Sequence, residues 1–213
     1  LKLSKRDLPF ALSKRQSGAT TVSATIWIAH NAGLFVFSTG GIGGVHRLLE
    51  DSLDISQDLI SLSETPIVTV SSGAKSILDL PKTVEFLETL SIPVVGYKTR
   101  FFPAFYTRSS GIKISNTVKT AKQTSLLFLD HLKLGLRSSL LVVNPISEKK
   151  EIPKKEIGVI INDSLYRAKK KNIKGKDLTP FLLKEIMQKT NGKSLSANIS
   201  LAKKNINISI YAK

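Results

Sequence analysis

The sequence feature that most constrains the fold is an apolar segment, residues 34–38, that runs directly into a glycine-rich turn at residues 40–44. Four of the chain's 13 glycines lie in that turn. Glycines gather in this way where the backbone needs a positive φ or must approach another group closely. A buried strand that ends in such a turn is a common way to present backbone N–H groups to an anion. A tight turn packed against a helix has the same pattern, so this stretch alone leaves both interpretations open.

Composition limits the classes of protein that the chain can belong to. Of its 213 residues, 41% are hydrophobic and none is cysteine, which favours a globular domain and excludes disulfides, zinc–thiolate sites and cysteine nucleophiles. No apolar run has the length of a membrane span or the flanks of a signal peptide. We therefore expect a single domain over residues 1–213, a cytoplasmic location and no membrane partner. Because Leu1 is not a methionine, we also expect a segment to precede it.

The net charge of +16 raises the question of nucleic-acid binding. Much of the lysine excess lies between residues 148 and 176, in a predicted surface helix with few aromatic residues for base stacking. This distribution favours a solvated helix face over contact with a polyanion, and we expect no dedicated nucleic-acid binding.

Apolar periodicity predicts strands that alternate with helices, and hence an α/β fold with helices on both faces of a largely parallel sheet. Polar or small residues follow three of the predicted strands, at residues 40–44, at residues 71–75 and at Asn144-Pro145. Ligands in such sheets bind beyond the carboxyl ends of the strands. We therefore expect these three strand ends to share one edge of the sheet, which favours a ligand site over a simple tight turn. The predicted strands cover residues 34–38, 66–70, 93–97 and 140–143, and the predicted helices cover residues 22–31, 59–62, 82–90, 120–136, 153–171, 179–190 and 194 onward.

Lys75 is the residue whose position most clearly suggests a catalytic role. It follows an apolar strand, among small residues and without an acid beside it in the sequence. At a partly desolvated site the pKa of a lysine falls, and the neutral amine can attack a carbonyl to form a Schiff base. The alternative is that Lys75 binds an anion as a point charge, and the residues alone leave both open.

An acidic segment, residues 49–58, stands out in this basic chain. Within it Asp54 and Asp58 are four residues apart, close enough to share one face of a helical turn. Carboxylate oxygens of this kind suit Mg²⁺ or Mn²⁺. The alternative to a metal site is that Asp54 or Ser56 caps a helix and that the remaining acid is solvated. For an isolated pair of acids this alternative is favoured. The three histidines do not have the spacing of metal ligands.

Several motifs, taken together and in order, closely resemble those of pseudouridine-5′-phosphate glycosidase, also known as the indigoidine-synthase-A-like family. The resemblance extends over the whole chain and implies a three-layer α/β/α fold with a largely parallel mixed sheet, assembled as a homotrimer. The matching segments are residues 4–10, 18–22, 38–47, 54–59, 73–80, 103–110, 144–146, 175–183 and 194–199.

The resemblance also implies an activity. The expected reaction is the reversible cleavage of the C–C glycosidic bond of pseudouridine 5′-phosphate to uracil and ribose 5-phosphate. A pseudouridylate synthase of this kind is a lyase-type glycosidase and uses a divalent cation, usually Mn²⁺. The family's nucleophilic lysine falls on Lys75 and its metal-site aspartate on Asp54. Its substrate-binding positions fall on Lys2, Val22, Ser56, Gln57, Asp58 and Asn198.

One departure from the family matters for the chemistry. The family's general acid is a glutamate in a Leu-Glu-Ser-Thr-type segment, for which these 213 residues have no counterpart. We expect it upstream of Leu1. The alternative function is that of a truncated or degenerate family member that binds sugar phosphate without turnover. We assign to the glycine turn the role of surrounding the phosphate with backbone N–H groups.

Overall fold

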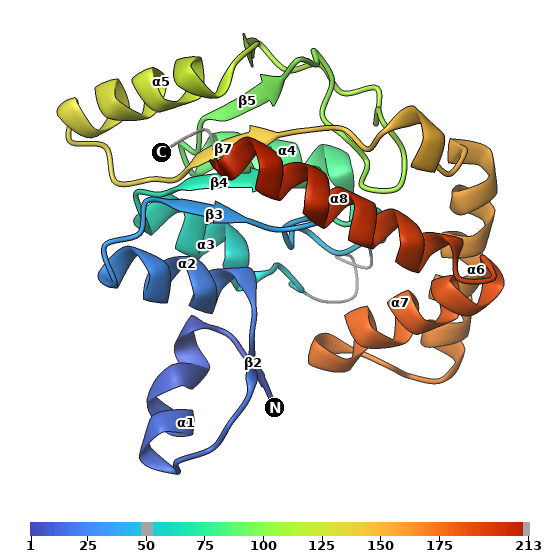
Figure 1. Cartoon of the computed structure of the whole chain (residues 1–213). Helices are drawn as coiled ribbons and strands as arrows, with labels where there is room; N and C mark the ends of the chain where they lie inside the picture. Colours follow the sequence, from blue (N-terminus) through green and yellow to red (C-terminus); the bar gives the residue numbers. More distant parts are fainter. Residues whose placement is uncertain (48–52, 211–213) are drawn as a thin grey trace.

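A computed structural model describes residues 1–47 and 53–210; the first part of the acidic segment lies outside these residues. At its centre is a five-stranded sheet in the order β3-β4-β7-β5-β6 (Figure 1). Every strand pairing in this sheet is parallel, so the largely parallel sheet expected from the sequence is confirmed. The strands are β3 (Val36–Ser38), β4 (Val68–Ser71), β5 (Val94–Tyr97), β6 (Asn116–Val118) and β7 (Leu140–Val143).

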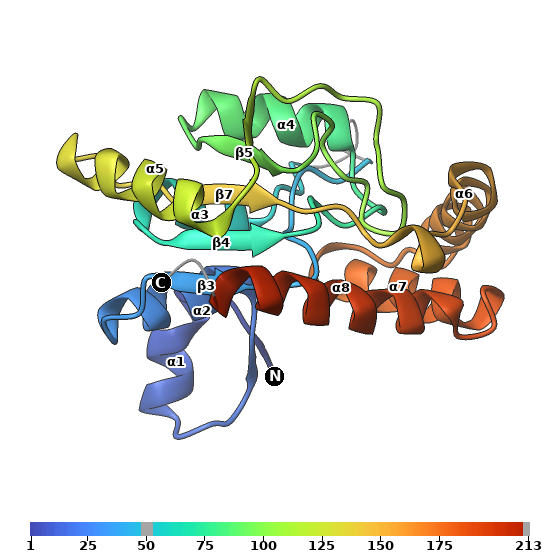
Figure 2. The ribbon, with the colours of Figure 1, turned by 45° about the horizontal axis from the view of Figure 1, so that its top comes forward.

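Helices cover both faces of this sheet, which gives three layers (Figures 1 and 2). Along β7, Leu141 and Val143 join the core cluster of α2 (Val22–Asn31), α3 (Gln57–Glu64) and α4 (Leu80–Thr89). The alternating residues Leu140 and Val142 face the other way and pack with α5 (Ala121–Lys133) and α8 (Lys193–Ile210). A strand buried on both faces must be apolar at every position, as β7 is.

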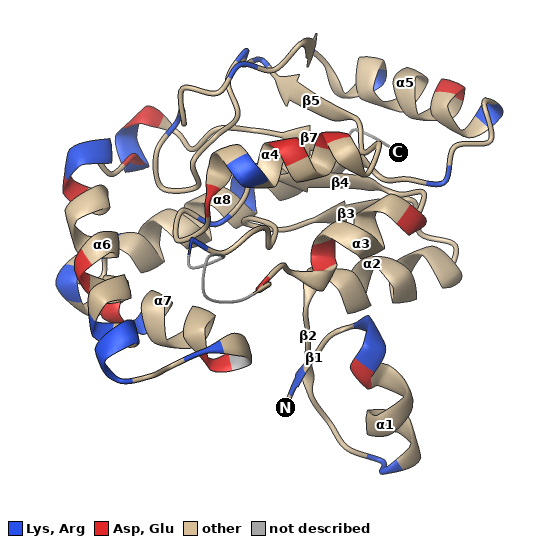
Figure 3. Ribbon diagram, turned by 180° about the vertical axis from the view of Figure 1, so that it is seen from behind, with Lys and Arg blue, Asp and Glu red and all other residues tan. Residues whose placement is uncertain are grey.

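The remaining helices, α6 (Lys154–Lys170) and α7 (Leu178–Lys189), form a pair beyond the carboxyl ends of the strands. Lysine and arginine lie along the outside of α6 (Figure 3). Asp163 of α6 is paired there with Arg167 of the same helix and with Lys189 of α7. The solvated helix face predicted from the lysine excess is confirmed. None of the described helices is long and apolar enough to cross a membrane.

Two elements differ from the sequence prediction. Helix α1 (Leu8–Ser13) is absent from the predicted helices, although Pro9 in its first turn is compatible with a helix because no hydrogen bond is lost there. This helix lies in a small lobe with β1 (Lys2–Leu3) and β2 (Ala19–Thr20), which pair in parallel. Strand β6 was not predicted, because two of its three residues are exposed and polar and it lies at the sheet edge.

Candidate functional site

The carboxyl ends of β3, β4 and β7 meet at one edge of the sheet, as the sequence predicted. The N–H of Ser72, just after β4, donates to the carbonyl of Gly40 at 3.0 Å, and that of Ile42 donates to the carbonyl of Gly73 at 3.1 Å. The N–H of Asn144, just after β7, donates to the carbonyl of Ser71 at 2.8 Å. Three segments that are far apart in the sequence are therefore bonded into one surface.

The glycines of the turn are required for close approach rather than for unusual backbone angles. None of the four has a positive φ. A Cβ on Gly43 would lie 2.1 Å from Oγ of Ser56, and one on Gly44 would lie 2.5 Å from Oγ1 of Thr83. A side chain at either position would displace a neighbouring element. The turn is therefore held against α3 and α4 by protein contacts.

Within this turn, the N–H groups of Ile42 and Gly43 do not surround a phosphate as predicted, because they donate to protein groups. For Gly40, Gly41 and Gly44 the role stays a prediction. The N–H of Gly43 donates to Oδ2 of Asp58 at 2.8 Å, and that of Val45 donates to Oγ1 of Thr83 at 3.0 Å. Ile42 donates to a carbonyl, as described above, and so does His46. Because these donors are already satisfied within the protein, they are not available to an anion.

Lys75 is fixed by its backbone and only partly exposed. Its N–H donates to the carbonyl of Ile42 at 3.1 Å, and its carbonyl accepts from Leu78 at 3.0 Å. Burial lowers the pKa of the Lys75 amine; the carboxylate of Asp58 opposes this shift and the ammonium of Lys2 adds to it. The desolvated lysine expected from the sequence is therefore present, which favours the neutral, nucleophilic form of its amine.

Asp58 is a buried carboxylate at the start of α3 and is only 5% exposed. Its Oδ1 accepts from the N–H of Ser23 at 2.9 Å and its Oδ2 from Gly43. Of the two caps considered, Ser56 is the N-cap residue of α3, and its Oγ accepts from the N–H of Asp58 at 3.2 Å. Asp58 thus connects α2, α3 and the glycine turn, and it provides the negative charge beside Lys75.

His46 joins this site although its spacing in the sequence gave no reason to expect it. Its Nδ1 lies 4.0 Å from Oδ2 of Asp54. Burial lowers the pKa of His46; Asp54 opposes the shift, while Lys2 and Lys75 add to it. Lys2, Lys75 and His46 are therefore close enough to interact, and their mutual repulsion favours the neutral forms of Lys75 and His46.

The donor set around Asp54 limits the kind of metal that could bind. Within the described part of the chain, no three His, Cys, Asp or Glu residues form a cluster that could hold an ion. A single partly exposed carboxylate suits Mg²⁺ or Mn²⁺, which keep several water ligands and take few from the protein. Zinc, which needs several protein ligands, does not fit this site.

The other predicted site residues lie around this centre. Lys2 is exposed on β1. Val22 is the first residue of α2 and packs in the core, and Gln57 accepts a long hydrogen bond of 3.5 Å from the N–H of Arg6. Asn198 of α8 lies against the glycine turn, since a Cβ on Gly40 would be 2.7 Å from its Oδ1. The site therefore draws on β1, α2, α3, the end of β4 and α8.

Asn205 of α8 was not predicted as part of this site. It is fully buried, and its Nδ2 donates to the carbonyl of Thr39 at 2.7 Å and to Oγ of Ser72 at 3.1 Å. Its Oδ1 accepts from Nδ2 of Asn144 at 2.9 Å. One side chain thus joins the ends of β3, β4 and β7. A signal was present, because Asn205 occupies the apolar stripe that Ala197 and Leu201 begin.

Comparison with known proteins gives a consistent result. A family model described as "Indigoidine synthase A like protein" matches residues 1–211. A pseudouridine-5′-phosphate glycosidase of Caldanaerobacter subterraneus subsp. tengcongensis is 48% identical over 208 residues, which are 98% of this chain and 68% of that protein. Other curated relatives with the same name are 45% to 50% identical.

Two solved structures share the fold. An indigoidine synthase A-like protein of Thermotoga maritima superposes with a TM-score of 0.92 at 38% identity, over all of this chain and 70% of that one. The prealnumycin C-glycosynthase AlnA, in complex with ribulose 5-phosphate, gives a TM-score of 0.91 at 36% identity, over 98% of this chain and 68% of that one. Among the curated relatives, the chain spans 61% to 68% of their length.

Proposed function

The chain belongs to the indigoidine synthase A-like family, and on this basis we propose that it carries the nucleophile of a pseudouridine-5′-phosphate glycosidase. The proposed reaction is the reversible conversion of pseudouridine 5′-phosphate to uracil and ribose 5-phosphate. Its relatives' names support the substrate, and the sugar-phosphate complex of AlnA supports a phosphorylated five-carbon ligand. The observation that carries the proposal is the lowered pKa of Lys75 at the joined strand ends.

In the cleavage direction, the neutral amine of Lys75 attacks C1′ of the ribose. The C1′–O4′ bond breaks, O4′ takes up a proton as the ring opens, and the nitrogen releases one. The nitrogen lone pair then forms a C1′=N⁺ iminium as the C1′–C5 bond breaks, and the electrons of that bond pass to C5 of uracil. Protonation of C5 completes uracil, and water hydrolyses the imine to release ribose 5-phosphate and free lysine. Covalent catalysis in this form supplies the nitrogen lone pair that expels C5 of uracil from C1′.

The described residues contribute to binding and charge balance in this scheme. Lys2 places a positive charge near Lys75, which favours a phosphate and also favours the neutral amine. Asp58 accepts hydrogen bonds from the N–H groups of Ser23 and Gly43, and so holds α2 and the glycine turn against the start of α3. We assign substrate contacts to Ser56, Gln57, Asp58, Val22 and Asn198, in addition to Lys2.

The proton for C5 of uracil is assigned by the family resemblance to a glutamate that has no counterpart in these 213 residues. We therefore assign nucleophilic attack and sugar-phosphate binding to this chain, and complete turnover to a protein that also contains that group. Asp54 would hold the divalent cation, which the family resemblance gives as Mn²⁺. Such a cation would supply positive charge that binds and polarises an oxygen atom of the substrate. We also propose a homotrimer on the same basis.

Reductive trapping tests the proposal directly. The chain is incubated with ribose 5-phosphate and sodium borohydride, which reduces an imine to a stable secondary amine, and the adduct is located by peptide mass spectrometry. We expect the adduct at Lys75 and its loss in Lys75→Met. Lys82→Met, which removes a more exposed lysine of α4, is the matched control and should keep it.

Two results would contradict the proposal. An adduct at another lysine would move the nucleophile elsewhere. Stabilisation of the folded chain by ribose 5-phosphate without any adduct would favour the alternative function, binding of sugar phosphate without turnover.

A further inference from the structure

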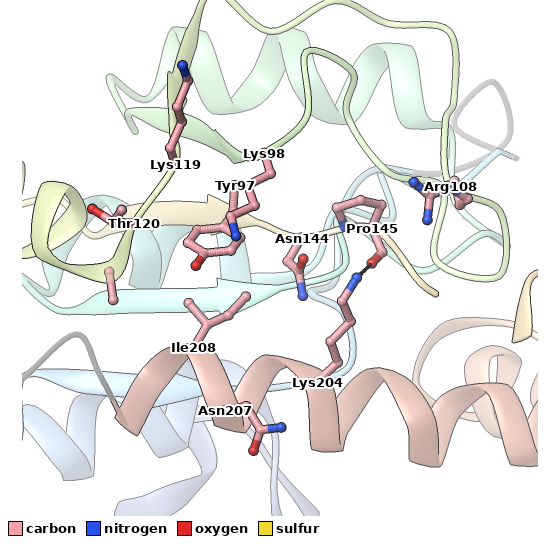
Figure 4. A pocket seen from close by; sticks show the side chains of 11 residues that line it. Tyr97, Lys98, Arg108, Lys119, Thr120, Asn144, Pro145, Lys204, Asn207 and Ile208 are labelled. Atoms are coloured by element: carbon pink, nitrogen blue, oxygen red, sulfur yellow. Dashed lines mark hydrogen bonds between the residues drawn. The ribbon is translucent and has the colours of Figure 1, made fainter. Parts of the chain in front are cut away.

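A second cavity, of about 570 Å³, opens between α8 and the carboxyl ends of β5, β6 and β7 (Figure 4). Four cationic side chains line it, and none of the described lining residues is acidic. Tyr97 and Ile208 provide apolar surface, and Asn144 lies at the end of β7. The four cations are Lys98, Arg108, Lys119 and Lys204.

The protein balances only part of the positive charge of this cavity. Lys204 donates to the carbonyl of Pro145 at 2.7 Å, and a neutral carbonyl leaves its charge uncompensated. Burial lowers the pKa of Lys204, Arg108 and Lys98 lower it further, and only Glu148 opposes them. Arg108 is 3.3 Å from Glu148, whereas neither Lys98 nor Lys119 forms an ion pair with any described residue. Cations held together in this way favour a bound anion.

The first turn of α5 adds to this positive potential. Thr120 is its N-cap residue and lines the cavity together with Ala121. The side chain of Gln123 accepts from the N–H groups of Lys119 and Thr120, so those two donors are already used. Helix α5 has 13 residues, and the positive end of its dipole still lies at the cavity.

This cavity is separate from the Lys75 site. Its walls come from α5 and α8, on the opposite face of the sheet from α3, which carries Asp58. None of the residues that line it belongs to the group of Lys2, His46, Asp54, Asp58 and Lys75. The two regions meet at α8, where Lys204 faces the cavity and Asn205 joins the strand ends.

We propose that this cavity is a second anion site, which binds the phosphate group of a phosphate monoester between Lys98, Lys204 and Arg108, the three cations that interact electrostatically. Phosphate fits because it offers several acceptor oxygens and a charge close to −2, and can therefore engage more than one cation together. The apolar surface of Tyr97 and Ile208 leaves room for the carbon skeleton of the ester.

The test is a titration of the ¹⁵N-labelled chain with inorganic phosphate, followed by NMR at constant ionic strength set with chloride. We expect saturable shifts of the amides of residues 119–122 and a dissociation constant that can be fitted from them. Lys98→Gln and Lys204→Met should each weaken this constant at least about tenfold, the loss of one charge-assisted hydrogen bond. Lys155→Gln removes an exposed charge on α6 and is the matched control, with little change expected.

Three comparisons make the outcome decisive. Because Lys98 is exposed, Lys98→Gln keeps the test valid even if Lys204→Met fails to fold. Lys75→Met should leave the shifts of residues 119–122 unchanged, so failure of the trapping experiment and failure of this site are distinguishable. Shifts no larger than those with chloride, or equal affinity in Lys98→Gln and the control, would overturn the proposal. A repeat with ribose 5-phosphate compares a phosphate monoester with the free ion, and binding of inorganic phosphate alone would overturn the monoester assignment.

Discussion

The N–H of Gly43 lies 2.8 Å from Oδ2 of Asp58, and this hydrogen bond joins the glycine turn to the start of α3. The second oxygen of the same carboxylate accepts from Ser23 at the start of α2. Among the residues that the structure describes, Asp58 is also the carboxylate that opposes the lowering of the Lys75 pKa. One buried side chain therefore sets both the geometry and the electrostatics of the site.

Gly43→Ala should destabilise the chain. Its Cβ would lie 2.1 Å from Oγ of Ser56 and 2.8 Å from Oδ2 of Asp58, so the hydrogen bond to Asp58 cannot persist without a backbone shift. We expect a loss of about 2 kcal/mol or more in the free energy of unfolding, measured by urea denaturation. Gly158→Ala is the control, because it has open space in the middle of α6 and should stabilise the chain by up to about 1 kcal/mol. Equal stability of the two variants would contradict the packing described here.

Asp58→Asn should both destabilise the chain and alter the chemistry of Lys75. An amide offers one acceptor oxygen where the carboxylate offers two, so its NH₂ would face the N–H of Ser23 or Gly43, at a cost of about 1–3 kcal/mol. Removal of the negative charge should lower the pKa of Lys75 further. In a borohydride trapping assay, the pH at which labelling reaches half its maximum should therefore fall relative to wild type. An unchanged midpoint would show that Asp58 does not act on Lys75.

Lys75→Met should stabilise the chain while it abolishes trapping. The pKa of Lys75 is lower in the folded than in the unfolded state, so the unfolded state binds more protons between these two values. Below the folded pKa, the buried charge therefore reduces stability, and this penalty is relieved as the pH rises toward the unfolded pKa of about 10.4. Near neutral pH we expect Lys75→Met to be more stable by roughly 1 kcal/mol or more, and the difference to shrink as the pH rises. Thermal unfolding of wild type and Lys75→Met across this pH range measures the difference in stability. A lower stability of the variant at neutral pH would contradict the prediction.

Asn205→Leu should separate the strand ends. The variant leaves the carbonyl of Thr39, Oγ of Ser72 and Nδ2 of Asn144 without the partner that Asn205 supplies. We expect a loss of roughly 2–4 kcal/mol, because each buried polar group left unsatisfied costs about 1–3 kcal/mol and some recover partners. Asn207→Ala, at an exposed asparagine of the same helix, should change stability by less than about 0.5 kcal/mol. We also expect faster amide hydrogen exchange at the ends of β3 and β4 in Asn205→Leu. Similar free energies of unfolding for the two variants would contradict the prediction.

Much of the fold was predictable because it depends on local patterns. Helix α2 and strand β7 have the bounds that apolar periodicity predicted, and Gly33 ends α2 with a φ of +76° as a C-terminal glycine should. The convergence of three strand ends followed from the rule for parallel sheets. Short elements with weak periodicity, such as β6 and β1, were not predictable, since their pairing depends on partners elsewhere in the chain.

Within the candidate site, the sequence identified Lys75 through its place after an apolar strand, and the family resemblance supplied Asp54 and Asp58. The sequence predicted that the backbone of the glycine turn is closely approached, but it could not identify the groups that approach Gly43 and Gly44. In the structure these groups are the side chains of Ser56, Asp58 and Thr83.

The sequence by itself determined the order of strands and helices, the small residues at the strand ends and the lysine that follows β4. Only the tertiary structure decided which carboxylate lies near that lysine, that Asn205 joins three strand ends, and that four cations share a second cavity. The physical reason is the range of the interactions. Periodicity and turn preferences arise from neighbours along the chain, whereas Asn144 and Asn205 are 61 positions apart and meet only because α8 packs across the sheet.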